Sequence, residues 1–80
     1  MSFSEKIRLS RIVLGHLESE PKRWTPLLKL TIVDSGTVSK FRTILHDLIE
    51  EGFVEQPEEG GVYIITEKGK RLLNGLRNNC

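Results

Sequence analysis

Residues that can contact phosphates or the edges of bases are concentrated between residues 35 and 46. The set comprises Ser35, Gly36, Thr37, Ser39, Lys40, Arg42, Thr43 and His46. Hydroxyl and cationic groups bond phosphate oxygens and the edges of bases, and a glycine lets the backbone approach a ligand closely. This stretch therefore suits recognition of a phosphate-rich partner better than it suits bond making or breaking.

Residues for catalysis or metal binding are sparse. His16, His46 and Cys80 are candidate metal ligands, but they show no recurring close spacing of the C-x-x-C or H-x-x-x-H kind. The sequence contains neither a glycine-rich phosphate loop with a Lys-Ser/Thr tail nor a nucleophile elbow. We therefore expect a protein that is not an enzyme and that holds no metal or cofactor.

The length and the charge balance narrow the class of protein. The chain has 80 residues, with 12 Lys+Arg against 11 Asp+Glu and 38% hydrophobic residues, so we expect one domain over residues 1–80 with one core. No apolar run approaches the roughly 18 residues of a membrane span, and the N-terminus lacks the apolar stretch of a signal peptide. These features predict a soluble cytoplasmic protein. Because the net charge is only +1, a preference for charged partners must come from the distribution of charges.

A first helix is predicted over residues 2–20. Ser2 and Glu5 fit a capping box, in which the Glu5 side chain reaches back to the helix start, and Pro21 ends the apolar pattern. Its apolar residues cover about 200° of the helix surface. That width fits a helix buried in its own core, and it equally fits a helix with a second apolar face for a partner subunit.

Two further helices are predicted around a turn at residues 34–36. The shorter one spans residues 25–31, with Thr25 as its cap and Pro26 at its first position. The longer one spans residues 35–51, and Gly52 is placed to end it in a left-handed conformation. Asp34 and Ser35 are candidate N-caps for this longer helix.

A β-hairpin and a last helix complete the pattern. The hairpin is predicted over residues 53–65, with strands at 53–56 and 62–65, and Trp24 is expected to pack against its base. Thr66 is expected to cap a helix over residues 66–78, and a small strand can precede the second helix. The resulting fold class is α+β and mainly helical.

Three segments carry a resemblance to a known family. They are residues 35–41 (SGTVSKF), residues 48–55 (LIEEGFVE) and residues 63–70 (YIITEKGK). The chain resembles small archaeal winged helix-turn-helix regulators, including those of archaeal viruses and plasmids, and more distantly PadR-like and MarR-like regulators. The resemblance implies a three-helix core, a hairpin wing and a C-terminal helix. It also implies that a homodimer binds double-stranded DNA to regulate transcription, with residues 35–51 as the recognition helix in the major groove.

The charge pattern of the predicted recognition helix is uneven. Placing its apolar residues inward turns Ser39, Lys40 and Thr43 outward, with Arg42 and His46 on the flank. The second half of the helix is acidic and would be repelled by phosphates. We therefore expect only the first half to enter the groove of a duplex.

The loop at residues 57–61 departs from the wing of a DNA-reading protein. It carries Glu58 and Glu59 instead of Arg or Lys, so we expect a weak or absent wing contact. Other cations would have to compensate, and the candidates are Lys22, Arg23, Lys29, Lys68, Lys70 and Arg71.

The dimer interface is predicted from the first and last helices. The expected interface residues are Leu9, Val13, Leu73, Leu76 and Cys80. An intersubunit Cys80–Cys80 disulfide is geometrically conceivable, although a reduced terminal thiol is favoured in an ordinary cytosol.

The leading hypothesis is a homodimeric, sequence-specific regulator that binds double-stranded DNA. One alternative is a winged-helix module that binds a protein partner and no nucleic acid, which the low net charge and the acidic loop favour. The other is an architectural protein that coats DNA. The near-zero net charge argues against coating, because non-specific affinity is mainly electrostatic.

Overall fold

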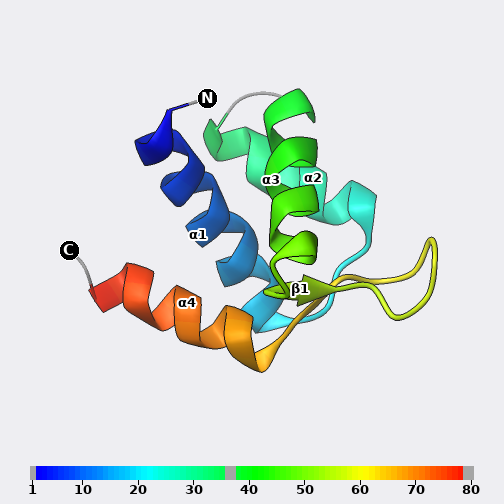
Figure 1. The fold of residues 1–80 in the computed structure, drawn as a ribbon. Helices are drawn as coiled ribbons and strands as arrows, with labels where there is room; N and C mark the ends of the chain where they lie inside the picture. Colours follow the sequence, from blue (N-terminus) through cyan, green and yellow to red (C-terminus); the bar gives the residue numbers. More distant parts are fainter. Residues whose placement is uncertain (1, 36–37, 79–80) are drawn as a thin grey trace.

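The computed structural model describes residues 2–35 and 38–78 of the chain. The elements follow the order α1 (Phe3–Ser19), α2 (Trp24–Ser35), α3 (Val38–Glu50), β1 (Val54–Glu55), β2 (Ile64–Ile65) and α4 (Glu67–Asn78) (Figure 1). This confirms the predicted α+β, mainly helical class. None of the helices in the described residues has the length and apolar character needed to cross a membrane.

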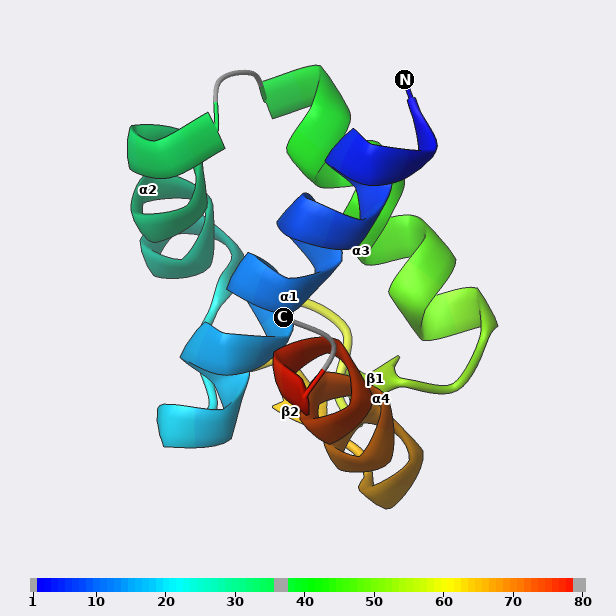
Figure 2. The same ribbon diagram turned by 90° about the vertical axis from the view of Figure 1, so that its left-hand side faces the viewer.

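Helix α1 lies at the centre of the fold and contacts α2, α3, α4 and β2. Figure 2 shows α1 with α2 and α3 on either side and α4 below. These neighbouring elements cover most of the wide apolar arc of α1. Leu9, Val13, Leu14 and Leu17 are buried, whereas Ile7 remains partly exposed. The arc therefore serves the chain's own core, with a remainder at the N-terminal end of the helix.

The core joins all four helices to the hairpin. Phe41, Ile44, Leu45 and Leu48 form the buried face of α3. The other buried apolar residues are Leu9, Val13, Leu14, Leu17, Leu27, Val54, Tyr63, Ile65 and Leu73. Because the buried face of α3 follows a single helical stripe, the opposite face of α3 is directed to solvent.

Three of the predicted helix ends are confirmed. Ser2 Oγ accepts a hydrogen bond from the Glu5 amide at 3.2 Å, and Thr66 Oγ1 accepts one from the Gly69 amide at 3.1 Å. Gly52 has φ +82°, and the Phe53 amide donates to the Leu48 carbonyl at 2.9 Å, as in a Schellman ending. The capping box is only half formed, because the Glu5 carboxylate accepts a hydrogen bond from Lys40 of α3.

The predicted bounds of the second helix are wrong. Helix α2 begins at Trp24 and continues to Ser35, so Thr25 is not its cap and Asp34 belongs to the helix instead of the turn. Thr31 is fully buried within this helix, and its hydroxyl is satisfied by donating to the Leu27 carbonyl at 2.8 Å. Pro26 lies in the first turn, where its missing N–H removes no intrahelical bond.

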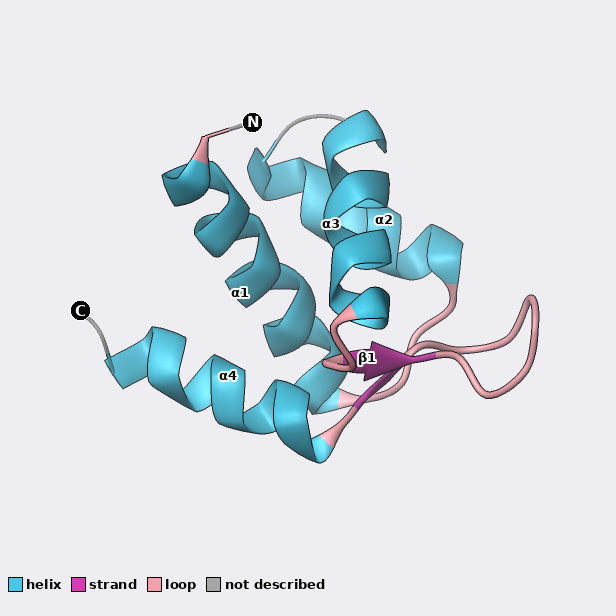
Figure 3. Ribbon diagram, in the orientation of Figure 1, coloured by secondary structure: helices cyan, strands magenta, loops and turns pink. Residues whose placement is uncertain are grey.

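The hairpin strands are shorter than predicted. Val54 pairs with Ile65 and Glu55 with Ile64 in an antiparallel register. Tyr63 turns instead to Lys22, with which it exchanges two backbone hydrogen bonds of 2.7 and 3.3 Å. The structure therefore has a single isolated bridge, and no strand, where a small strand was expected before the second helix. The loop beyond the strands projects away from the helices, as Figure 3 also shows.

Candidate nucleic-acid interface

The exposed face of α3 carries four of the predicted contact residues. Ser39, Arg42, Thr43 and His46 are all exposed, and they recur at intervals of three and four residues, which places them on one side of a helix. The buried face of α3 lies on the opposite side. We call these four residues the polar face of α3. They bring two hydroxyl groups, a guanidinium and an imidazole to a single surface.

Lys40 does not belong to the polar face of α3. Its side chain is directed toward α1, where its ammonium donates to Glu5 Oε2 at 2.9 Å, and it is only 39% exposed. This hydrogen bond, together with the nearby positive charge, holds the pKa of Glu5 below its usual value. The prediction that Lys40 points outward to a partner is therefore wrong, because its side chain lies on the side of α3 that faces α1.

Arg42 is positioned by an aromatic pair. The ring of Trp24, at the start of α2, meets the ring of Phe41 edge to face, with centroids 4.8 Å apart and an interplanar angle of 62°. The guanidinium carbon of Arg42 lies 5.9 Å from the Trp24 centroid, a distance at which cation–π attraction holds the group over the ring. Trp24 thus packs on Phe41 of α3, and it supports the guanidinium of the polar face.

The hydroxyl groups of the polar face keep part of their bonding capacity. Thr43 Oγ1 donates to the Ser39 carbonyl at 3.0 Å, so its oxygen remains able to accept from a ligand. His46 lies 3.8 Å from Glu50 across one helix turn, and both side chains are about two thirds exposed. The face can therefore both donate and accept at its centre, and it becomes acidic toward the end of α3.

Three of the predicted contact residues precede α3. Ser35 is the last residue of α2 instead of the first residue of the recognition helix. Gly36 and Thr37 lie outside the described residues, so the predictions for them stay predictions.

His46, Asp47 and Glu50 form a cluster that the sequence spacing did not single out as a metal site. Their ligand atoms lie within 4.8 Å of one another. Asp47 is paired with Lys6 at 3.3 Å, and His46 lies beside Glu50. Lys6 therefore already neutralises one of the two carboxylates. The cluster has the character of an exposed, charged helix surface.

The hairpin loop is exposed and acidic, as predicted. Its tip is built by a hydrogen bond from the Gly61 amide to the Glu58 carbonyl at 2.9 Å and by Gly60 with φ +78°. Across residues 43–67 the chain carries seven of its eleven acidic residues and no Lys or Arg. The acidic region therefore extends from the end of α3 through the whole hairpin.

The cations proposed to compensate for this loop fall into two groups. Lys22 is bonded to Glu20 at 2.9 Å and lowers the pKa of that carboxyl, Lys70 is paired with Glu67 at 3.7 Å, and Lys68 donates to the Glu51 carbonyl. The remaining candidates, Arg23, Lys29 and Arg71, are exposed. Arg23 directly precedes α2 and so lies next in sequence to the Trp24 that supports Arg42.

The predicted dimer interface is largely wrong. Leu9, Val13 and Leu73 are at most 1% exposed within the single chain, because α1 packs on α2, α3 and α4, and α4 packs on α1 and β2. They have no surface left for a second chain. Leu76 is half-buried and lines a groove, and Cys80 lies outside the described residues. The wide apolar arc of the first helix leaves Phe3 and Ile7 exposed at its N-terminal end.

Comparisons of the chain with protein-family models, with curated proteins and with solved structures found no match. The case for a function therefore depends on the geometry of the chain itself.

Proposed function

We propose that this chain is a winged helix-turn-helix protein that binds double-stranded DNA and regulates transcription as a homodimer. In this proposal α2 and α3 form the helix-turn-helix, α3 is the recognition helix and the β1–β2 hairpin is the wing. The polar face of α3 would lie in the major groove.

The observation that carries the proposal is the polar face of α3. Its four side chains are exposed while the opposite face of the same helix is buried. From Ser39 to His46 the helix rises about 10 Å, which matches about three base-pair steps of duplex DNA. Hydroxyl, guanidinium and imidazole groups over that length are suited to base edges and phosphates.

The geometry favours DNA contacts from the helices over DNA contacts from the hairpin. Arg42 is held over Trp24, and Arg23 is exposed just before α2, so two guanidinium groups are available from the helix-turn-helix. Glu58 and Glu59 at the hairpin tip would repel phosphates. We therefore expect few phosphate contacts and a shallow dependence of affinity on salt, because each contact contributes about −0.9 to the slope on duplex DNA.

The acidic stretch favours a second candidate function. A module that binds a basic surface on a partner protein would use residues 43–67, which lack Lys and Arg. In that case the polar face of α3 would be dispensable. A DNA-coating role is less favoured, because a net charge of +1 gives little non-specific attraction.

Fluorescence anisotropy at low and at physiological salt tests the proposal. The duplexes are the DNA upstream of the protein's own coding sequence and mixed-sequence DNA. We expect tighter binding to the upstream duplex, and this preference should survive physiological salt. Equal affinity for all duplexes with a steep salt slope would indicate coating, and no binding even at low salt would overturn the DNA proposal.

Charge reversal locates the contact surface. Arg42→Glu should weaken binding to the upstream duplex by at least about tenfold. Arg71→Glu makes the same charge change at an exposed position on α4 and serves as the matched control. Equal effects of the two variants would show that α3 is not the surface that meets DNA.

A further inference from the structure

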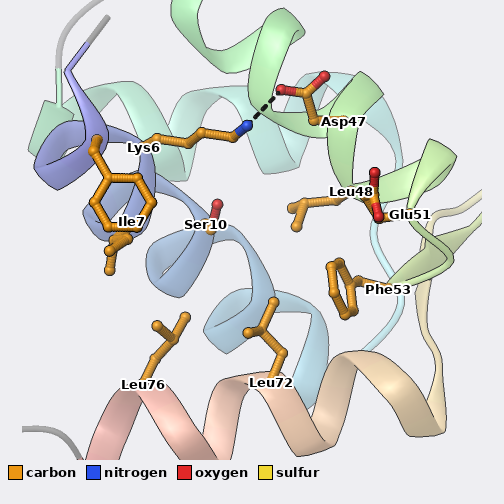
Figure 4. A pocket seen from close by; sticks show the side chains of 10 residues that line it. Lys6, Ile7, Ser10, Asp47, Leu48, Glu51, Phe53, Leu72 and Leu76 are labelled. Atoms are coloured by element: carbon orange, nitrogen blue, oxygen red, sulfur yellow. Dashed lines mark ion pairs between the residues drawn. The ribbon is translucent and has the colours of Figure 1, made fainter.

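A hollow opens between α1, the end of α3 and α4. Its volume is about 410 Å³, within the roughly 300–1,000 Å³ of sites that enclose small molecules. We call it the α1–α4 groove, and Figure 4 shows the side chains around it. Its walls are mostly apolar, and they are formed by Phe3, Ile7, Leu48, Phe53, Leu72 and Leu76. These walls suit the hydrocarbon part of a ligand.

Two of the apolar walls, at the start of α1, are incompletely covered by the chain itself. Phe3 is 76% exposed and Ile7 is 36% exposed. They lie four residues apart, so they stand on one side of α1. A ligand that covers them removes apolar surface from water, and this favours binding.

The charged groups that line the groove are not balanced. Asp47 and Glu51 contribute two carboxylates, and Lys6 is the one cation among the described residues that line it. Lys6 is already paired with Asp47 at 3.3 Å, whereas Glu51 has no ion pair within the described parts of the chain. One cation against two carboxylates leaves the lining with a net charge of −1.

Both carboxylates stand at the end of α3. The Glu51 amide donates to the Asp47 carbonyl at 3.0 Å, so the Glu51 side chain lies one helical turn beyond that of Asp47 on the same side. The carbonyl groups of the last turn of a helix add partial negative charge. Lys68 donates to one of them, the Glu51 carbonyl, at 2.6 Å, but it does not line the groove. This end of the groove therefore favours a cation over an anion.

Ser10 of α1 points to a ligand independently of these charges. It is only 9% exposed, it lines the groove, and it stands between Ile7 and Leu48 in Figure 4. Its hydroxyl forms no hydrogen bond within the part of the chain that the structure describes, whereas the buried hydroxyl of Thr31 donates to a backbone carbonyl. Because buried hydroxyl groups normally have a partner, a ligand that donates to Ser10 Oγ would complete this one.

We propose that the α1–α4 groove binds a small amphiphilic amine. The hydrocarbon part of the amine lies among the apolar walls and covers Phe3 and Ile7. Its N–H groups donate to the acceptors of the groove, which are the carboxylates of Asp47 and Glu51 and the hydroxyl of Ser10. None of the four residues of the polar face of α3 lines the groove, so this site does not depend on DNA binding.

Titrations of the full chain, followed by its amide NMR signals, test the proposal. The probes are phenylbutylamine, phenylbutanol and phenylbutyrate, which share one apolar body and differ in the charge of the polar end. Ligands of about a dozen non-hydrogen atoms bind at about the millimolar level. We expect the amine to bind at least about tenfold more tightly than the carboxylate, with the alcohol between them. The shifted amides should lie in the first turns of α1, at the end of α3 and in α4.

Substitutions separate the charged, polar and apolar contacts. Glu51→Gln should weaken binding of phenylbutylamine by about fivefold and leave that of phenylbutanol nearly unchanged. Glu50→Gln is the matched control, because Glu50 is exposed on the same helix end and does not line the groove. Ser10→Ala should weaken binding of the amine by about threefold. Phe3→Ala should weaken binding of all three probes alike, and the spectrum without probe reports whether each variant is folded.

Four outcomes would overturn the proposal. They are equal affinity for the amine and the carboxylate, equal effects of Glu51→Gln and Glu50→Gln, shifts confined to other elements, and no saturable shift up to about 10 mM probe. A dilution series without probe supplies the last check. If the same amides shift on dilution alone, a second copy of the chain covers the groove, and the groove is not a site for an amine.

Discussion

The first half of α3 and the hairpin loop are both exposed and polar, but they differ in charge and in support. The polar face of α3 carries Arg42 and is backed by the fully buried Phe41 and its neighbours. The loop carries Glu58 and Glu59 and connects two strands of only two residues each. A surface that must fit a rigid duplex needs fixed side chains and positive charge. Under the proposed function, the comparison therefore favours α3 over the hairpin as the surface that meets DNA.

The largest expected effect comes from a substitution at the junction between the hairpin and α4. It tests whether disturbing the hairpin affects DNA binding by α3. A Cβ on Gly69 would collide with the Phe53 carbonyl oxygen and would lie 2.8 Å from Ile65 Cγ1. We expect Gly69→Ala to lower the free energy of unfolding by about 3 kcal/mol, measured by urea titration. If α3 alone recognises DNA, the fraction that stays folded should keep its affinity.

Gly75 provides the control for this substitution within the same helix. It is exposed, and a Cβ there would meet nothing within 4 Å. Gly75→Ala should be neutral or stabilising by up to about 1 kcal/mol, because alanine is the better helix former. Equal urea midpoints for the two variants would show that Gly69 does not pin the hairpin to α4.

Reversing the charge of the loop tests whether its negative charge alone prevents a contact with DNA. In the double variant Glu58→Lys/Glu59→Lys the repulsion is replaced by attraction. We expect affinity for duplex DNA to rise up to about tenfold, with a salt slope steeper by about one for each phosphate gained. The measurement is anisotropy at several salt concentrations.

The neutral variant Glu58→Gln/Glu59→Gln separates the two contributions to that gain. It removes the repulsion without supplying a new contact, so its salt slope should stay close to that of the unchanged protein. If the lysine variant gains no affinity over the glutamine variant, the loop lies too far from the duplex to touch it.

Much of the scaffold could be predicted from local signals. The capping hydroxyls Ser2 and Thr66 and the left-handed Gly52 act within a few residues of themselves, so sequence is sufficient to place them. The end of α2 could not be predicted in this way. The turn signal at residues 34–36 competed with the burial of Thr31, which depends on the packing of the whole fold.

Most residues of the candidate site could be named from the sequence, but the directions of their side chains could not. The spacing of Ser39, Thr43 and the cations indicated a polar surface on α3. It could not show that Lys40 pairs with Glu5, a contact between residues 35 positions apart. The prediction that Leu9, Val13 and Leu73 form a dimer interface was wrong for a related reason. An apolar stripe does not say whether its own chain or a second chain covers it.

The position of Lys40 leads to a small expected effect on binding. Because its ammonium is directed to Glu5 on the α1 side, Lys40→Gln should reduce DNA affinity by less than about threefold, whereas Arg42→Gln should reduce it by about tenfold. Both variants remove one positive charge from α3 at positions two residues apart, so each is the control for the other. Comparable losses in anisotropy titrations would mean that Lys40 leaves Glu5 to meet the duplex.

The smallest expected effect is the pH dependence of the Glu5–Lys40 pair. The hydrogen bond from Lys40 lowers the pKa of Glu5 in the folded protein relative to the unfolded chain. The pair therefore stabilises the fold at pH values above the usual pKa of a glutamate, and that contribution is lost as the pH falls through the lowered pKa. Lys40→Gln should have a slightly lower unfolding midpoint than the unchanged protein at neutral pH, and the difference should vanish in acid. Circular dichroism melts at both pH values measure this, with Lys29→Gln as a control at an exposed position on α2. A difference that persists in acid would show that Lys40 stabilises α3 through its packing and not through the charge of Glu5.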